Sequence, residues 1–433
     1  MRNFISNLLI LIALPISVLY SQQNFWVKLN SPTSQPLKKV FFVDSLYGWC
    51  VGDSGTIVHT TNGGLTWILQ NSKVYSYLAE VYFKDRNNGY VFGWEFSSFY
   101  GTYILKTTNG GNTWDTTRYW QNDVYLKTIY FHDALTGYMA GFPANIMKTT
   151  DGGNTWVQCQ IDSALVSNFP VNKISFYNRQ FGIACGGVMD IAGVVWITTN
   201  YGASWTPHIL APEPLYGIMF FDSLNILCVG GDFEYGPSFI RTSNAGANWS
   251  YRTLGIIGLA TALSFRTMAE GWVPLYSVLK FLRSTDYGVN WDEIDSPDNV
   301  NVADVFFVND RVGFFVGDSG VIYKFNPPVG IHNKTTELPV SFNLNQNFPN
   351  PFNSSTTLSY TVPEPALIEI KLYNILGQEI MTVVSGVKRS GNYFYNLNLD
   401  FLSSGIYICI MQYSSLTSSN LKGKKSIKLT IIK

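Results

Sequence analysis

The feature that most constrains this chain is a short motif that recurs along its first two thirds. Its clearest copies read Lys-Thr-Thr-Asn-Gly-Gly-Asn-Thr-Trp at 106–114 and Lys-Thr-Thr-Asp-Gly-Gly-Asn-Thr-Trp at 148–156. Six copies end in a tryptophan, and successive tryptophans are 47, 42, 49, 44 and 42 residues apart: Trp67, Trp114, Trp156, Trp205, Trp249 and Trp291. A period of about 40 to 50 residues is typical of the four-stranded blade of a β-propeller.

A second pattern precedes each tryptophan motif. Residues 40–52 read Val-Phe-Phe-Val-Asp-Ser-Leu-Tyr-Gly-Trp-Cys-Val-Gly, which indicates a strand, a tight turn and a strand. This opening occurs seven times, the last at 305–317, and two prolines at 327–328 then end the repeats before a fourth strand. Residues 24–31, which include Trp26, resemble the strand that begins at Trp67, so we expect them to supply the missing outer strand. The predicted fold is all-β, a seven-bladed β-propeller over 22–326 that an N-terminal strand closes.

The turn residues of the motif have a physical reason. Asn or Asp at the start of the turn accepts hydrogen bonds from turn amides, and a glycine two residues later suits a positive φ. The tryptophan can pack between blades. The predicted structural residues are Asn62, Gly64, Trp67, Asn109, Gly111, Trp114, Asp151, Gly153, Trp156, Asn200, Gly202, Trp205, Asn244, Gly246, Trp249, Asp286, Gly288 and Trp291.

This turn resembles the Asp box, or BNR repeat, of sialidases, sortilins and xyloglucanases. Together with Gly-Trp-x-Val-Gly-x-x-Gly-x-Ile at 48–57, the repeat looks most like the propellers of the photosystem II assembly-factor type. In these families the box is structural. Asn replaces Asp in four of the six copies here, which keeps the acceptor oxygen but removes the charge, and so weakens any idea of cation binding.

Composition excludes several classes of protein. Lys and Arg together number 29, as do Asp and Glu, so the net charge is zero, and aromatic residues make up 15%. A nucleic-acid-binding protein should carry a basic face, and a disordered one should lack apolar residues. Five cysteines without Cys-x-x-Cys spacing indicate buried apolar side chains rather than a zinc site or a disulfide framework: Cys50, Cys159, Cys185, Cys228 and Cys409.

Both ends of the chain carry transport signals. A basic residue at position 2, an apolar run over 8–19 and a small residue at 21 predict a signal peptide over 1–21, and no later segment is apolar for long enough to span a membrane. Residues 327–340 read as a linker, and short alternating strands over 341–433 predict a small Ig-like β-sandwich.

The C-terminal segment resembles the type A sorting domain of the type IX secretion system of Bacteroidetes. The resemblance lies in Asn-Phe-Pro-Asn-Pro-Phe-Asn at 347–353, Tyr-Asn-Ile-Leu-Gly-Gln at 373–378 and Ser-Gly-Ile-Tyr at 404–407. It implies contact with the secretion translocon, export across the outer membrane, removal of the domain, and then release or attachment to surface lipopolysaccharide. The alternative is an ordinary adhesive sandwich.

Loop lengths indicate where a ligand would bind. In a blade whose strands A to D run from centre to rim, the A–B turns and the Asp boxes lie on one face and are nearly constant in length. The B–C loops and D–A segments lie on the other face and vary, which favours recognition of a protein or glycan there. The predicted contact residues are Trp94, Tyr100, Trp120 and Tyr235. The alternative is that these aromatics pack their own loops. We expect a monomer.

Catalysis is the weaker hypothesis. A sialidase would need an arginine cluster and a tyrosine nucleophile, and its Arg-Ile-Pro signature is absent. A xyloglucanase-type mechanism needs two carboxylates beside a cleft, which four acids in B–C loops could supply: Glu95, Asp190, Asp232 and Glu234. Four scattered histidines predict no metal site. We therefore predict no catalytic, cofactor-binding or metal-binding residues and favour a non-enzymatic binding protein; a secreted glycoside hydrolase and an assembly factor for an envelope complex are the alternatives.

Overall fold

A computed structural model describes residues 25–143, 146–162, 166, 168–327, 341–347, 350–353, 355–388, 391–417 and 421–432. The chain divides into two compact units, Met1–Pro328 and Val329–Lys433. The expected signal peptide over 1–21 lies outside the described residues, as does the expected linker from residue 328 onwards. Within the described ranges the chain forms strands and three short 3₁₀ turns, and no helix there is long and apolar enough to cross a membrane.

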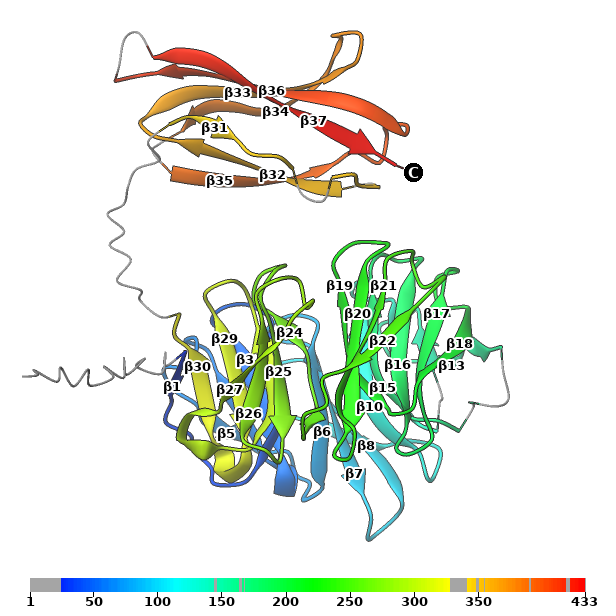
Figure 1. Ribbon diagram of the computed structural model, residues 1–433. Helices are drawn as coiled ribbons and strands as arrows, with labels where there is room; N and C mark the ends of the chain where they lie inside the picture. The colour runs from blue at the N-terminus through cyan, green and yellow to red at the C-terminus, as the bar shows by residue number, and fades with distance from the viewer. Residues whose placement is uncertain are drawn as a thin grey trace, which may run out of the picture. The chain divides into compact units, whose positions relative to one another are not determined.

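Seven sheets follow one another along the first unit, and each is one blade of a propeller (Figure 1). Blade one is β2 (Leu37–Phe42), β3 (Gly48–Gly52), β4 (Ile57–Thr60) and β5 (Ile68–Gln70). Blade two is β6 (Tyr77–Phe83), β7 (Gly89–Glu95), β8 (Gly101–Thr107) and β9 (Asp115–Arg118). Blade three is β10 (Tyr125–Phe131), β11 (Gly137–Phe142), β12 (Met147–Thr149) and β13 (Val157–Gln158).

The remaining blades depart slightly from this plan. Blade four is β15 (Val171–Phe176), β16 (Gly182–Val188), β17 (Ala192–Thr198) and β18 (Ser204–Ala211), and β14 (Gln160–Ile161) adds a parallel fifth strand beside β18. Blade five is β19 (Leu215–Phe220), β20 (Ile226–Asp232), β21 (Gly236–Thr242) and β22 (Ser250–Thr253). In blade six, β23 (Leu259–Ala260) and β24 (Ser264–Phe265) share the inner position beside β25 (Gly271–Tyr276), followed by β26 (Lys280–Ser284) and β27 (Asp292–Asp295).

The N-terminal strand closes the ring. Blade seven is β28 (Val302–Phe307), β29 (Gly313–Gly317), β30 (Ile322–Phe325) and, as its outer strand, β1 (Trp26–Lys28). Trp26 pairs with Phe325, is 3% exposed, and packs against an aromatic cluster that includes Phe315 at 4.9 Å. The prediction of a seven-bladed propeller closed by an N-terminal strand is confirmed.

A phenylalanine and a glycine recur in six of the seven openings, because the phenylalanine ring fills the space beside the glycine; in blade five Phe220 pairs with Ile226 instead. Phe42 ends β2 and pairs with Gly48. A Cβ atom added to Gly48 would lie only 2.4 Å from the Phe42 ring, which is too close for any side chain at this position. Phe83 and Gly89 have the same relation in blade two, with 2.4 Å between the ring and the added Cβ. The glycine in the repeated opening is therefore required by close packing of the inner strand.

The second unit is a β-sandwich. One sheet contains β31 (Asn343–Leu344), β32 (Ser355–Val362) and β35 (Gly391–Asn398). The other contains β34 (Glu379–Lys388), β33 (Ala366–Asn374), β36 (Gly405–Ser415) and β37 (Lys422–Ile431) in that order. Ile368, Ile370 and Leu372 of β33 are fully buried in the core, as the alternation along the strand predicts. All five cysteines are free and buried.

Candidate functional site

The side chains of each Asp box are engaged within its own turn. Asn109 Oδ1 accepts the Thr113 amide at 3.0 Å, and Asn109 Nδ2 donates to Thr113 Oγ1 at 2.8 Å. Thr107 Oγ1 accepts the amide of Gly111 at 2.9 Å. The six box glycines have φ between 68° and 90°. Side chains of the turn itself thus hold its backbone, and these polar atoms already have partners.

In five of the six boxes the tryptophan packs against the inner phenylalanine of its blade. Trp114 lies edge-on to Phe83 at 5.9 Å, and Trp205 lies edge-on to Phe176 at 5.6 Å. Trp67 contacts both Phe42 of its own blade and Phe314 of blade seven. These contacts fill the space between neighbouring blades, which is a structural role.

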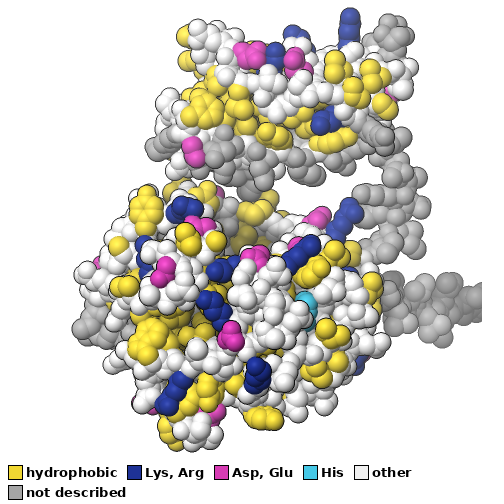
Figure 2. Space-filling model, turned by 180° about the vertical axis from the view of Figure 1, so that it is seen from behind, with side chains coloured by type: hydrophobic (Ala, Val, Ile, Leu, Met, Phe, Trp, Pro, Cys, Tyr) yellow, Lys and Arg dark blue, Asp and Glu magenta, His cyan; other side chains and the backbone are white. Residues whose placement is uncertain are grey.

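The four predicted contact aromatics have different environments. Trp94 at the end of β7 is half-buried, and its Nε1 donates to the carbonyl oxygen of Leu126 at 2.7 Å. Tyr100, Trp120 and Tyr235 are exposed. Tyr235 belongs to blade five, so the structure does not bring it beside the three residues of blade two. On the side of the propeller seen in Figure 2, hydrophobic side chains form several separate groups among polar atoms.

Trp94 is the centre of an aromatic group at the variable-loop face. Its ring lies 5.2 Å from that of Tyr77 and 5.9 Å from that of Tyr125, and Phe96 stacks on Tyr125 at 5.2 Å. We call Tyr77, Trp94, Phe96 and Tyr125 the Trp94 cluster. Phe96 is 54% exposed. The cluster forms because β6 and β10 begin, and β7 ends, at this face.

The inner strands of all seven blades line a central cavity of about 300 Å³. In six of them the pairing with the next strand shifts by one residue near the start, as between Leu37 and Lys39 of β2. The residues directly after this bulge are Lys39, Glu80, Thr128, Lys173, Gly217 and Asp304. Because A strands begin at the variable-loop face, the charged members of this set lie toward that end of the cavity.

These charges partly compensate one another. Lys39 Nζ lies 3.6 Å from Asp304 Oδ1, and Asp304 Oδ2 accepts the amide of Val40 at 3.1 Å. Burial opposes the charge of Lys39, but the carboxylates of Asp304 and Glu80 raise its pKa. Burial raises the pKa of Glu80, and Lys173 and Lys39 act against this shift. The cavity therefore presents cations and anions close together where burial disfavours their charged forms.

Lys127 lies beside this charged end. Its Nζ donates to Asn172 Oδ1 at 3.0 Å and lies 5.6 Å from the centre of the Trp94 ring. Burial, with a smaller effect of the Lys39 charge, lowers the pKa of Lys127 to about 8. Its partners among the described residues are a neutral amide and an aromatic ring, and none of them is a carboxylate, so the Lys127 cation is open to a ligand anion or carbonyl oxygen.

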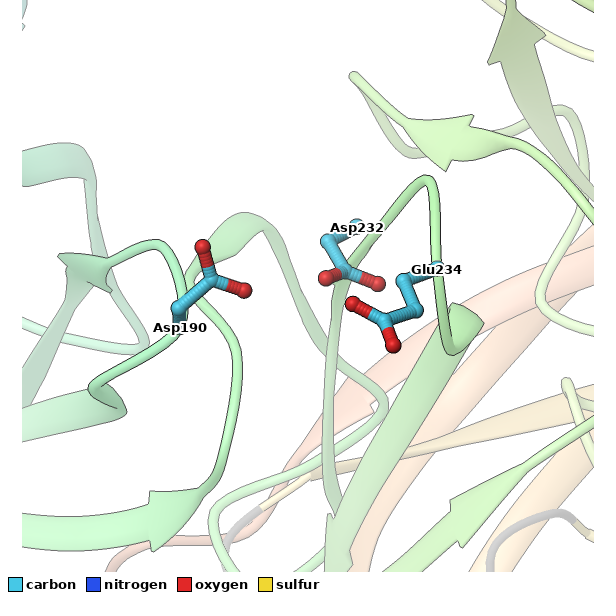
Figure 3. A group of neighbouring side chains, drawn as sticks. All are labelled: Asp190, Asp232 and Glu234. Atoms are coloured by element: carbon cyan, nitrogen blue, oxygen red, sulfur yellow. The ribbon is translucent and has the colours of Figure 1, made fainter.

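The structure brings together three of the four carboxylates considered in the B–C loops. Figure 3 shows Asp190 on one loop facing Asp232 and Glu234 on another, and one oxygen of each lies within 4.8 Å of the others. Buried Glu213 accepts the amide of Asp190 at 3.1 Å, and burial and the nearby carboxylates raise its pKa. Oxygen atoms in such a group suit a hard cation such as Ca²⁺.

Glu95 is not part of this group. Its Oε1 accepts both the amide and the hydroxyl of Ser97, at 2.7 and 2.6 Å, and Oε2 accepts the hydroxyl of Ser76 at 3.1 Å. These hydrogen bonds lower the pKa of Glu95 to about 2, and those from Ser97 have the largest effect. The carboxylate holds the blade-two loop in shape.

Two sets of residues were missed by reasoning from the sequence. One is the buried hydroxyl two residues before each box Asn or Asp, in Thr60, Thr107, Thr149, Thr198, Thr242 and Ser284. The other is the charged end of the cavity with Lys127. For both sets a signal was present: a hydroxyl residue at one repeat position, and a charge within an otherwise apolar inner strand.

Comparisons with known proteins match both units. A family model described as photosynthesis system II assembly factor YCF48 matches residues 18–119, 67–219 and 118–258, and one described as a secretion system C-terminal sorting domain matches 346–427. No curated protein matches the chain.

Solved structures of propellers share the fold. YCF48 bound to a D1 peptide is 20% identical, with a TM-score of 0.56 over 70% of this chain and 97% of that one. The GH74 xyloglucanase of Xanthomonas campestris is 10% identical, with a TM-score of 0.55 over 77% and 59%. PorZ, a surface component of the type IX secretion system of Porphyromonas gingivalis, is 12% identical, with a TM-score of 0.50 over 91% and 59%. At these identities the likeness concerns the fold alone.

Proposed function

Because the chain belongs to the family of the photosystem II assembly factor YCF48 and ends in a secretion sorting domain, we propose that it is an exported, non-enzymatic propeller that binds a protein segment. The binding site is the variable-loop end of the central cavity, where the Trp94 cluster adjoins Lys127. The sorting domain implies export to the cell surface or the medium and interaction with the secretion machinery.

One observation carries this proposal. The Trp94 cluster offers aromatic faces, of which that of Phe96 is exposed. Lys127 lies 5.6 Å from the Trp94 ring, and no carboxylate in the described part of the chain pairs with it. Aromatic side chains beside a desolvated cation are the kind of surface that dominates the free energy of protein binding. Such a surface recognises a polypeptide that combines an apolar side chain with a carbonyl or carboxylate oxygen.

A relative gives further support. The YCF48 structure that shares this fold is bound to a D1 peptide. A propeller of the same architecture therefore accommodates a peptide, and by analogy we propose an extended segment of an envelope protein as the ligand here. An assembly role in an envelope complex is one form this binding would take.

The proposed route of export follows the two terminal signals. A signal peptide over 1–21 directs the chain across the inner membrane, and residues 341–433 then contact the type IX translocon. We expect that a chain lacking 341–433 is retained in the periplasm, as cell fractionation would reveal. Equal amounts of the shortened and full chains outside the cell would contradict this route.

Selection from a phage-displayed peptide library on the immobilised mature chain tests the binding site. We expect enrichment of a shared peptide pattern that Trp94→Ala and Lys127→Met abolish. Leu65→Ala, at an exposed position of the first Asp box on the opposite face, is the matched control and should keep it. Enrichment that survives Trp94→Ala, or binding to a glycan array without any peptide enrichment, would overturn the proposal.

A glycoside hydrolase is the second candidate, and the acidic group in Figure 3 is the observation that favours it. Retaining glycosidases hold their two carboxyl groups about 5 Å apart. Asp232 and Glu213 are, however, only 3% and 1% exposed, which leaves little room for a glycosidic oxygen beside either of them. Turnover of any glycan in a hydrolysis screen, lost in Asp190→Asn, would favour this candidate over binding alone.

A further inference from the structure

A second cavity, of about 220 Å³, lies between blades two and three. Alternating residues of β7, β8 and β9 form one wall: Tyr90, Phe92, Ile104, Lys106, Asp115 and Thr117. Ile129, Met139, Asn154 and Trp156 of blade three form the other. No residue of the Trp94 cluster and no charged residue of the central cavity lines it, so this site goes beyond the proposed function.

The outer half of blade three has shorter strands than that of blade two. Its third strand β12 has three residues and its fourth strand β13 has two, whereas β8 and β9 beside them have seven and four. The neighbouring blade-three tryptophan, Trp156, is correspondingly half-buried, although Trp114 of blade two is fully buried. Blade three therefore leaves part of the blade-two surface formed by β7, β8 and β9 uncovered.

Tyr119 gives this cavity an unfilled hydrogen-bonding position. It lines the cavity and is 1% exposed, yet its hydroxyl has no hydrogen-bond partner among the described residues. Burial raises its pKa, so the group stays a neutral phenol. A buried polar group without a partner destabilises the free protein, and a ligand that supplies the partner recovers that loss.

The entrance carries a large aromatic ring. Trp120 follows Tyr119 and is 57% exposed, and its ring lies against that of Tyr119 at 3.9 Å with a tilt of 38°. Lys106, Asp115 and Asn154 contribute polar groups near the opposite end of the cavity wall, where Lys106 Nζ lies 3.4 Å from Asn154 Oδ1. The site thus combines an apolar interior, one unpaired hydroxyl, an aromatic entrance and polar groups at its edge.

We propose that this cavity binds the side chain of a tyrosine presented by another polypeptide. A phenol ring is flat and apolar, which suits the walls formed by Phe92, Ile104 and Met139, and its single hydroxyl would pair with that of Tyr119. The polar side chains of Lys106, Asp115 and Asn154 would form hydrogen bonds with the backbone of that polypeptide. A sugar ring fits less well, because it would place hydroxyls against the apolar side chains of Phe92, Ile104 and Met139, where a tyrosine ring places only carbon.

Calorimetric titration of the mature chain with N-acetyl-tyrosine amide and with N-acetyl-phenylalanine amide tests the proposal. We expect saturable binding of the tyrosine compound, and binding of the phenylalanine compound that is about fivefold weaker, the effect of one hydrogen bond. Tyr119→Phe should remove this difference, because it deletes the hydroxyl and leaves the packing intact. Trp120→Ala should weaken both compounds.

Tyr235→Ala, at an exposed aromatic of blade five, is the matched control and should bind both compounds as the wild type does. Equal affinity of the wild type for the two compounds would overturn the proposal, as would the absence of saturable binding. Tighter binding of methyl glucopyranoside than of the tyrosine compound would assign the cavity to a sugar instead. Loss of peptide selection in Trp94→Ala leaves these outcomes unchanged, so the two proposals fail separately.

Discussion

A single buried hydroxyl organises each Asp box at the residue scale. Thr107 Oγ1 donates to Asn109 Oδ1 at 3.0 Å and accepts the amides of Asn109 and Gly111, so it links both ends of the turn. The hairpin therefore depends on a residue of the motif that lies in the strand before the turn. The glycines and the Asn or Asp attract attention in the sequence because they are turn formers, whereas a threonine in a strand does not.

Thr107→Val tests this role. The change keeps the shape of the side chain but leaves the amides of Asn109 and Gly111 without this partner and removes one hydrogen bond to Asn109 Oδ1, so we expect the free energy of unfolding to fall by about 1–3 kcal/mol. Denaturant unfolding measures the difference. Asn109→Asp is the control, because Asp151 makes equivalent bonds to the amide and hydroxyl of Thr155 in blade three. A Thr107→Val protein as stable as the wild type would contradict the role assigned to the hydroxyl.

His59 makes stability depend on pH. It stacks on Trp49 at 4.6 Å, and burial lowers its pKa to about 4 from 6.5. Between these values the unfolded chain binds a proton that the folded chain does not. The contribution of His59 to the free energy of unfolding is therefore complete above pH 6.5. It is lost as the pH drops toward 4, by up to about 3 kcal/mol.

His59→Phe should reduce the loss of stability between pH 6.5 and pH 4, because phenylalanine retains the stacking surface and cannot bind a proton. Thermal or denaturant unfolding of both proteins at pH values from 4 to 7 provides the comparison. We expect the two stability curves to diverge below pH 6.5, with the variant the less sensitive. Curves that stay parallel down to pH 4 would contradict the account of His59.

The order of strands could be predicted at the element scale, but their irregularities could not. The period of the tryptophan motif and the count of seven openings predicted the blades and the role of Trp26. The bulge near the start of the inner strands is a feature of the backbone, and the strand pattern in the sequence did not predict it. The extra strand β14 pairs with β18 across 44 residues, as Gln160 with Ser204, which is a tertiary contact rather than a local preference.

The same limit applies to the candidate site. The variable-loop face was predicted from loop length, and Trp94 is central to the cluster found there. The partners of Trp94 could not be predicted, because Tyr77, Phe96 and Tyr125 come from different strands and meet only through the ring geometry. Tyr235 has a similar sequence context but lies in another blade, so it contributes to no shared surface with Trp94.

The bulge in the inner strand explains why a second glycine recurs near the end of the second strand of the blades, as at Gly230 in blade five. A Cβ atom on Gly230 would lie 2.0 Å from the carbonyl oxygen of Pro214, where the inner strand of blade five shifts. Gly230→Ala should therefore disturb the pairing of β19 with β20 and lower the free energy of unfolding by about 1–3 kcal/mol or more. Denaturant unfolding again measures the change.

Gly93 offers the matched control for Gly230. It holds the same repeat position in blade two, but the nearest atom to an added Cβ is Leu78 Cδ2 at 3.0 Å, a side-chain atom that can move. Gly93→Ala should cost clearly less than Gly230→Ala. Equal losses in the two proteins would show that the backbone contact at the bulge is not what requires glycine.

Ring closure determines stability at the scale of the whole propeller. Trp26 anchors β1 in an aromatic cluster with Phe281, Phe315 and Phe325, and this contact joins the two ends of the propeller. Trp26→Ala should lower the free energy of unfolding by about 3–5 kcal/mol. Val27→Ala, on the exposed side of the same strand, should change it little. Similar losses for both would argue against closure through Trp26.

The central claim is that the exported propeller binds a protein through the Trp94 cluster and Lys127. Cross-linking of the mature chain in envelopes of the cells that produce it, followed by mass spectrometry, tests this most directly. We predict that the wild type and Leu65→Ala recover the same cross-linked protein, with the links near Trp94, and that Trp94→Ala and Lys127→Met recover little of it. Equal recovery by all four proteins, or a loss confined to Leu65→Ala, would contradict the account.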